Sequence, residues 1–140
     1  MSYIDETLLP DEHVVYRTRL HWIIFARGVL VLIAFHAVPL AGAAVMAVGV
    51  AMLIPPLIAY QTTELGVTNK RMIVKVGFVR RRTLELLLRQ VEALSVDQTL
   101  GGRMLGYGTI TLSGTGGVRE IYHRVREPLE LRRRIQGQVA

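Results

Sequence analysis

Apolar residues follow one another almost without interruption from Trp22 to Tyr60, whereas polar and apolar positions alternate on either side. This run of 39 residues contains one formally charged side chain, Arg27. A membrane-spanning helix needs about 20 predominantly apolar residues, and the segment Pro39-Leu40-Ala41-Gly42 near the middle is typical of a turn. The pattern therefore predicts a transmembrane helical hairpin over residues 20–60, with helices at about 20–38 and 41–60.

The N-terminal segment, residues 1–19, is polar with scattered apolar positions. The stretch 13–18 is compatible with one short strand. Two interpretations are open for this segment. It is either a loose cytoplasmic lead-in or a segment that packs on the C-terminal domain or on a neighbouring subunit.

From residue 61 onward the hydrophobic pattern changes to the alternation of β-strands. Strand-like stretches cover 63–67, 72–76, 78–88, 91–98, 107–113 and 118–124, and residues 99–105 are compatible with one helical turn. Glu127-Pro128 opens a terminal helix, because proline is favoured in the first helical turn. The sequence therefore predicts an α+β membrane protein in which residues 61–140 form an antiparallel β-sandwich or partly open barrel, capped by a C-terminal helix.

The positive charge of the chain belongs to this C-terminal domain. Residues 61–140 carry 14 Lys and Arg against 7 Asp and Glu, a net charge of +7, while the whole chain carries +6. A basic domain beside a bilayer faces anionic headgroups, with about 1 kcal/mol of attraction per nearby basic residue. No recognition helix or set of stacking aromatic residues is present, so we do not expect a nucleic-acid partner.

Basic residues near the ends of the apolar run indicate its orientation. Arg17 and Arg19 precede the run, Lys70 and Arg71 follow it, and the expected turn has none. By the positive-inside rule, we expect an integral membrane protein with both termini cytoplasmic.

Two polar residues, Arg27 and His36, lie within the apolar run. Arg27 either snorkels to the interface or pairs with a carboxylate, which a second subunit can supply. His36 lies near the far end and is expected to be neutral at the opposite interface. Because ionisable residues in membranes are often functional, a transporter or channel element is a further hypothesis, and it requires an oligomer.

Little in the sequence indicates catalysis. The chain has no cysteine, which excludes disulfides and thiol chemistry, and its four histidines lack metal-ligand spacing. Ser95 and Ser113 have no nucleophile-elbow sequence, and Gly114–Gly117 lacks the lysine of a phosphate-binding loop. We expect a protein without enzymatic activity, cofactor or metal.

Three groups of residues in the C-terminal part have a familiar combination and spacing. They are Val67-Thr68-Asn69-Lys70-Arg71, the run Arg80-Arg81-Arg82 leading to Glu85, and Leu100-Gly101-Gly102-Arg103-Met104-Leu105-Gly106-Tyr107-Gly108-Thr109 followed by Gly114-Thr115-Gly116-Gly117. Together they resemble the bacterial pleckstrin-homology-like (PH) domain family of small membrane proteins. The resemblance covers about residues 61–137, and the upstream hairpin is similar to the family's usual two spans. It implies two antiparallel sheets with a C-terminal helix, a location in the bacterial cytoplasmic membrane, no enzymatic activity and no settled ligand.

Six basic residues are candidates for contact with lipid phosphate: Lys70, Arg71, Lys75, Arg80, Arg81 and Arg82. The alternatives are a solvated strand face that pairs with Glu85 and Glu92, or a protein interface. The leading expectation for function is a scaffold or protein-interaction module at the inner face of the membrane. It would associate with itself through small-residue helix faces, or with another membrane protein. The alternative function is an anionic phospholipid-binding module.

Overall fold

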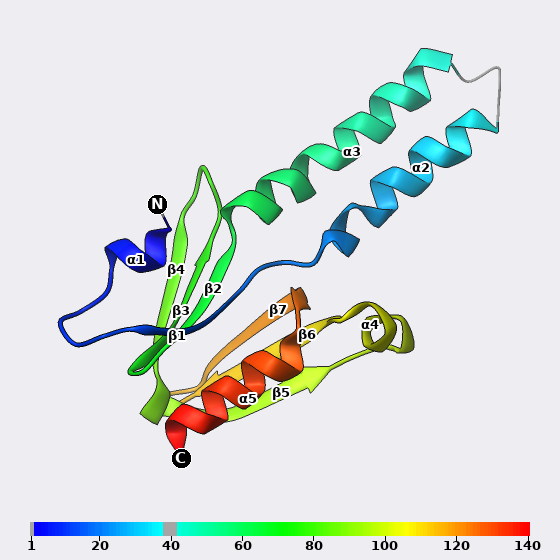
Figure 1. Ribbon diagram of the computed structural model, residues 1–140. Coiled ribbons are helices and arrows are strands. Elements are labelled where there is room, and N and C mark those ends of the chain that lie inside the picture. Colours follow the sequence, from blue (N-terminus) through cyan, green and yellow to red (C-terminus); the bar gives the residue numbers. More distant parts are fainter. Residues whose placement is uncertain (1, 38–41) are drawn as a thin grey trace.

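A computed structural model of the chain describes residues 2–37 and 42–140. Within these residues the strands form two separate antiparallel sheets and not a closed barrel. A C-terminal helix, α5 (Pro128–Val139), packs against the sheets, and a pair of helices projects away from them (Figure 1). The α+β class, the antiparallel sheets and the C-terminal helix confirm the sequence prediction. The expected turn at Pro39–Ala41 lies outside the described residues.

The first sheet combines residues from both sides of the long apolar run. Its strands are β1 (Val14–Thr18), β2 (Glu64–Thr68), β3 (Arg71–Val76) and β4 (Arg82–Leu87), in the order β1-β2-β3-β4. Strand β1 pairs antiparallel with β2. Of the two interpretations of the N-terminal segment, packing on the C-terminal domain is therefore confirmed. The sheet also extends beyond the expected domain start at residue 61.

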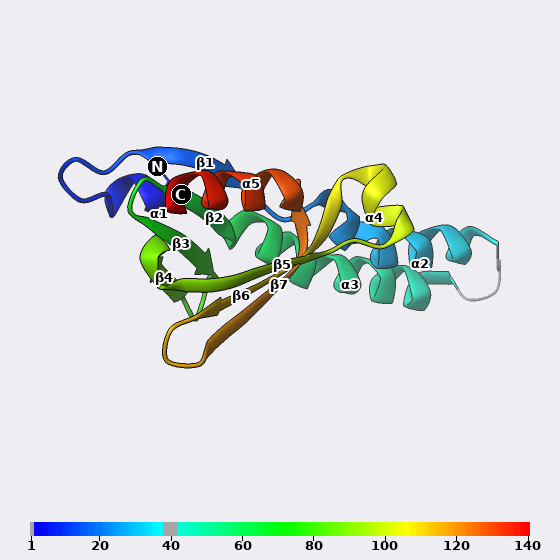
Figure 2. The same cartoon turned by 90° about the horizontal axis from the view of Figure 1, so that it is seen from below.

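A short helix, α1 (Tyr3–Glu6), covers the outer face of this sheet. Figure 2 shows α1 lying alongside β1 at the end of the molecule opposite the helix pair. Ile4 is fully buried, and a Cβ added to Gly66 of β2 would lie 2.6 Å from its Cδ1 atom. Gly66 thus leaves the space that Ile4 fills, which anchors the chain before β1.

The second sheet follows a short 3₁₀ turn, η2 (Leu88–Gln90). Its strands are β5 (Val91–Asp97), β6 (Tyr107–Gly114) and β7 (Val118–Arg126), in the order β5-β6-β7, with helix α4 (Leu100–Leu105) between β5 and β6. The core lies between the sheets and α5: Leu65, Val67, Met72, Val74, Leu88, Ile110, Leu112, Val125, Leu131 and Ile135. Burial of each such side chain stabilises the fold by roughly 1.5–3 kcal/mol.

The apolar run forms η1 (Trp22–Phe25), α2 (Ala26–His36) and α3 (Gly42–Thr62), inserted between β1 and β2. Among the described residues, α3 alone is long and apolar enough to cross a membrane, with 21 residues and a mean hydropathy of 2.1. The stretch Trp22–His36 is apolar but shorter. The predicted hairpin of two transmembrane helices is therefore not established.

The first helical stretch starts later than expected for a structural reason. Leu20 forms a β-bridge with Val125 of β7, and the backbone N–H of His21 donates to the carbonyl of Arg124 at 2.7 Å. These bonds hold residues 20 and 21 in extended backbone against the second sheet, so the helix begins only at Trp22.

Candidate functional site

Both ends of the helix pair leave the same region of the first sheet. Thr18, the last residue of β1, is paired with Leu65, and α3 ends at Thr62, just before β2. The connection from α3 to β2 is tight, since the N–H of Thr63 donates to the carbonyl of Ala59 at 3.0 Å. The residues around these two ends form the part of the domain closest to the helices.

The structure divides the six basic candidates between the two ends of the first sheet. Glu64, near the end of α3, pairs with Lys75. The β3–β4 turn (Gly77–Arg81) therefore lies beside the end of α3, whereas Lys70 in the β2–β3 turn lies at the opposite end (Figure 1). The Nζ of Lys70 donates to the carbonyl of Pro10 at 2.9 Å. Lys70 and Arg80 thus cannot act as one contact surface.

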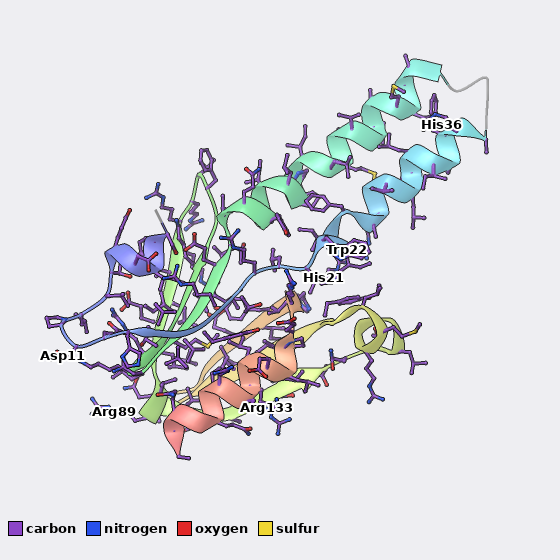
Figure 3. The ribbon with its side chains drawn as sticks, in the orientation of Figure 1. Asp11, His21, Trp22, His36, Arg89 and Arg133 are labelled. Atoms are coloured by element: carbon purple, nitrogen blue, oxygen red, sulfur yellow. The ribbon has the colours of Figure 1, made fainter. Side chains whose placement is uncertain are left out.

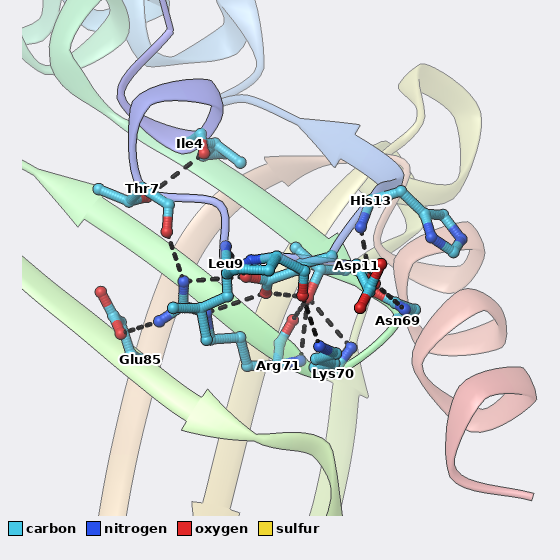
Figure 4. A network of polar contacts seen from close by, with 12 residues as sticks. Ile4, Thr7, Leu9, Asp11, His13, Asn69, Lys70, Arg71 and Glu85 are labelled. Atoms are coloured by element: carbon cyan, nitrogen blue, oxygen red, sulfur yellow. Dashed lines mark hydrogen bonds and ion pairs between the residues drawn. The ribbon is translucent and has the colours of Figure 1, made fainter.

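Arg71 is buried in an ion-pair network rather than exposed (Figure 4). Its Nε lies 2.9 Å from Oε1 of Glu12 and its Nη2 lies 3.0 Å from Oε2. Its remaining donors bond Glu85 and the carbonyl of Thr7. Because its hydrogen-bonding capacity is used within the domain, we assign Arg71 a structural role and leave it out of the lipid-contact set.

The carboxylate of Glu12 has no exposed surface. Burial opposes its ionisation, but hydrogen bonds from Arg71, the N–H of Leu9 and the hydroxyl of Thr68 outweigh that effect. Together they lower the pKa of Glu12 to about 2. The network therefore contains an ionised pair at neutral pH, and it fastens the N-terminal segment to β3.

Lys75 and Arg82 also make contacts within the domain. The Nζ of Lys75 lies 5.0 Å from the ring centroid of Tyr3, a cation–π geometry. Arg82 pairs with Glu120 of β7, which links the edges of the two sheets beside a cavity of about 210 Å³. Both residues remain partly accessible, but their positions are set by these partners.

Arg80 and Arg81 are exposed at the end of the first sheet where α3 ends. Both are in the β3–β4 turn, and within residues 2–37 and 42–140 no carboxylate forms an ion pair with either one. The two residues before them, Phe78 and Val79, are 69% and 96% exposed. Sequence reasoning missed these two because it assigned 78–88 to one strand; Gly77, with φ of 96°, marks the turn instead.

A second exposed apolar group lies on α4, where Leu100 is 79% and Met104 is 86% exposed. The hydroxyl of Thr99 caps this helix by accepting from the N–H of Gly102 at 3.1 Å, and Gly106 ends it with φ of 82°. The glycine-rich motif thus forms a short helical excursion between β5 and β6. The hydrophobic pattern of the sequence did not indicate which side chains of α4 are exposed.

His21 connects α4 with the start of the helix pair. Its ring centroid lies 5.1 Å from that of Trp22 and 5.2 Å from that of Tyr107, the residue that begins β6. Its Nδ1 accepts from the N–H of Ile23 at 3.2 Å, which caps η1. Figure 3 shows His21 and Trp22 together at the domain end of the helix pair. Helix α4 therefore lies beside the start of η1, as the β3–β4 turn lies beside the end of α3.

The two polar residues of the apolar run lie at opposite ends of α2. Arg27 is exposed near the domain end, and no carboxylate pairs with it in the described part of the chain. His36 lies at the far end, with its Nδ1 3.1 Å from the carbonyl of Leu32 (Figure 3).

A sheet of four strands and a sheet of three strands, with a shared core and a C-terminal helix against it, define a PH-like domain. Comparison with protein families matches residues 13–139 to the family described as Bacterial PH domain. The chain belongs to this family. The match begins at residue 13, so it includes β1 and the inserted helices as well as the expected range 61–137. Comparisons with curated proteins and with solved structures gave no match.

Proposed function

We propose that this protein is a membrane-anchored PH domain protein that acts as a non-enzymatic interaction module at the inner face of the bacterial cytoplasmic membrane. The observation that carries the proposal is helix α3. Only 6% of its apolar window is buried within the protein. A core helix with this composition would be covered by other parts of the chain, so a helix apolar on all sides and left uncovered fits a bilayer.

The pairing of β1 with β2 extends the proposal to α2. If α3 crosses the membrane, the chain before it must cross in the opposite direction, because both strands belong to one sheet. With the 3₁₀ rise for η1 and the α-helical rise for α2, Trp22–His36 covers about 24 Å, less than the hydrocarbon core of about 30 Å. Local thinning of the bilayer and snorkelling of Arg27 accommodate a short span.

The charge distribution supports cytoplasmic termini. The domain that holds both termini contains residues 61–140, with their net charge of +7, and Arg17 and Arg19 precede the helices. Positive residues near the ends of membrane helices favour the cytoplasmic side.

Extraction of the full-length chain from membranes tests the anchor. We expect the protein to resist alkaline carbonate and to be released by detergent. Substituting Val48→Lys with Ile54→Lys in α3 should make it extractable, because each lysine at a helix centre costs about 2.5–3.5 kcal/mol of insertion free energy. The matched control is Val118→Lys with Ile121→Lys on β7, where both residues are also exposed. Equal extraction of both variants would reject the anchor.

We propose that copies of the chain associate with one another to form the scaffold. Gly49 lies at the contact between α2 and α3, where an added Cβ would lie 2.5 Å from the side chain of Leu32. Ala43 and Ala47, four residues apart on α3, are exposed and leave a small-residue face for another copy. Native mass measurement of the detergent-solubilised protein tests this form, and a monomer at every concentration would reject it.

Binding of anionic phospholipid is the second candidate function, favoured by the exposure of Arg80 and Arg81 beside the end of α3. We expect the full chain to retain more phosphatidylglycerol than phosphatidylcholine, in a salt-sensitive manner. Arg80→Gln with Arg81→Gln should remove this preference. Arg89→Gln with Arg132→Gln is the charge-matched control, since both of these residues are exposed on other parts of the domain. An unchanged preference in the first variant would dismiss the turn as the site.

A further inference from the structure

We infer that the PH domain rests on the bilayer through two apolar protrusions, one on each side of the helix pair. One is the tip of the β3–β4 turn with Phe78 and Val79. The other is the outer face of α4 with Leu100 and Met104. Both insert into the interfacial region of an anionic membrane, with their neighbouring arginines at the headgroups. This inference rests on the proposed membrane insertion of α2 and α3.

The β3–β4 turn is built to hold its apolar tip away from the core. Gly77 adopts a left-handed conformation, and a Cβ at this position would collide with the carbonyl oxygen of Arg80. The chain therefore reverses sharply, and Phe78 and Val79 project with 69% and 96% of their surface exposed. Neither side chain belongs to the core between the sheets. Two adjacent exposed apolar side chains at a turn tip are typical of a contact with another apolar phase.

Helix α4, beside the second sheet, also presents apolar side chains that are exposed. Its fold depends on Gly102 and Gly108, because a Cβ on Gly102 would lie 2.6 Å from the carbonyl oxygen of Tyr107 and one on Gly108 would lie 2.8 Å from that of Asp97. The contact at Gly102 packs α4 against the start of β6, and the contact at Gly108 packs β6 against the end of β5, while Leu100 and Met104 remain almost fully exposed. The packing of α4 therefore does not require Leu100 and Met104 to be apolar.

The two protrusions flank the helix pair on opposite sides. The turn follows β3, whose Lys75 pairs with Glu64 just after α3. Helix α4 precedes Tyr107, which contacts His21 at the start of the helix pair. In Figure 1 the β3–β4 turn lies on the α3 side of the helix pair and α4 lies on the α2 side.

The neighbouring charges identify the membrane as the occupant. Arg80 and Arg81 directly follow the apolar tip of the turn, and the exposed Arg103 directly precedes Met104 on α4. Trp22, 56% exposed, begins η1 beside the end of α4, where an aromatic residue suits the interface. Apolar side chains with adjacent cationic ones are the composition of interfacial membrane contacts. A bilayer around α3 reaches both protrusions at once, which a second copy on one face does not.

The absence of cysteine makes a direct test possible. Single substitutions Val79→Cys and Met104→Cys would be labelled with an environment-sensitive fluorophore in the full-length chain. The chain would be reconstituted into vesicles of phosphatidylethanolamine and phosphatidylglycerol. Val48→Cys on α3 reports on the anchor itself. Thr115→Cys, in the exposed β6–β7 turn, reports on a part of the domain away from the membrane. Iodide in water and a quencher attached to lipid measure the access to each label.

We expect the labels at residues 79 and 104 to be quenched by the lipid-borne quencher and protected from iodide, and the label at 115 to behave in the opposite way. If the label at 48 is in lipid while those at 79 and 104 are accessible to iodide, the inference fails and the proposed anchor stands. If the label at 48 is itself accessible to iodide, the proposed anchor fails. Protection of residues 79 and 104 from both quenchers would show a protein contact and overturn the inference. Equal quenching in phosphatidylcholine vesicles would overturn the role of the arginines.

Discussion

Arg71 on β3 and Glu12, in the segment before β1, form a buried ion pair across 59 positions of sequence, with the whole helix pair between them in the chain. Two parallel contacts of 2.9 and 3.0 Å give the bidentate geometry that arginine makes with a carboxylate. This pair joins the chain that enters the helices to the sheet that follows them.

Removing one partner of this pair should destabilise the domain strongly. Glu12→Ala leaves the guanidinium of Arg71 buried with part of its hydrogen bonding lost, and we expect the free energy of unfolding to fall by about 3 kcal/mol. Chemical unfolding in detergent measures the change. Glu6→Ala removes an exposed carboxylate of the same segment and should change stability by less than about 0.5 kcal/mol. Equal effects of the two variants would contradict the structural role of the pair.

The same pair predicts a dependence of stability on pH. The pKa of Glu12 is about 2 in the folded protein and 4.5 as its ordinary value. Since the folded state holds the proton less tightly, the stabilisation is complete above about pH 4.5 and is lost as the pH falls toward 2. Glu12→Gln should flatten this part of the stability curve. A wild-type curve that is already flat between pH 5 and pH 2, measured by thermal unfolding, would show that the carboxylate is not paired.

Two neighbouring glycines of the Leu100–Thr109 motif should respond differently to the same substitution. An alanine Cβ at Gly102 would lie 2.6 Å from a backbone oxygen of Tyr107, whereas one at Gly101 would lie 3.5 Å from its hydroxyl. We expect Gly102→Ala to lower the free energy of unfolding by about 2 kcal/mol through overpacking. Gly101→Ala should be neutral or slightly stabilising, because alanine is the better helix former. A larger loss at residue 101 than at 102, by thermal unfolding, would contradict the packing of α4 against β6.

Packing between α2 and α3 gives a further matched pair. Gly49→Leu would force a side chain into the position of Leu32, and we expect a loss of about 1–3 kcal/mol in helix-pair stability. Ala51→Leu lies on an exposed part of α3 and should have little effect. The melting temperatures of the two variants are compared by following the helical circular dichroism signal on heating in detergent. Similar melting of both variants would show that the helices do not pack through Gly49.

The local elements of this fold were largely predictable because each follows from a short stretch of sequence. Alternation of apolar and polar residues predicted β6 and β7, and Pro128 marked the start of α5. The insertion of the helices into the first sheet was not predictable in this way. The pairing of Val14 with Thr68 is a long-range contact, and the apolar run between them looks like a domain boundary.

The candidate site was predictable in composition but not in arrangement. Arg71 and Arg80 are alike in sequence, yet only Arg71 meets the carboxylate of Glu12, a contact created by tertiary packing. Phe78 continued the alternation expected of a strand, so its exposure became visible only with the turn at Gly77. The length of the first helix was overestimated because composition does not show the bond from His21 to Arg124.

Site-directed labelling in intact cells tests the central claim, the insertion of α2 and α3 with both termini on the cytoplasmic side. Single cysteines would be placed at Ala43, at the start of α3, and at Asp11 and Thr115, in exposed turns of the domain. A membrane-impermeant maleimide should label residue 43 from outside and should reach residues 11 and 115 only after the membrane is permeabilised. Labelling of all three only after permeabilisation would contradict the account, because α3 would then not cross the membrane.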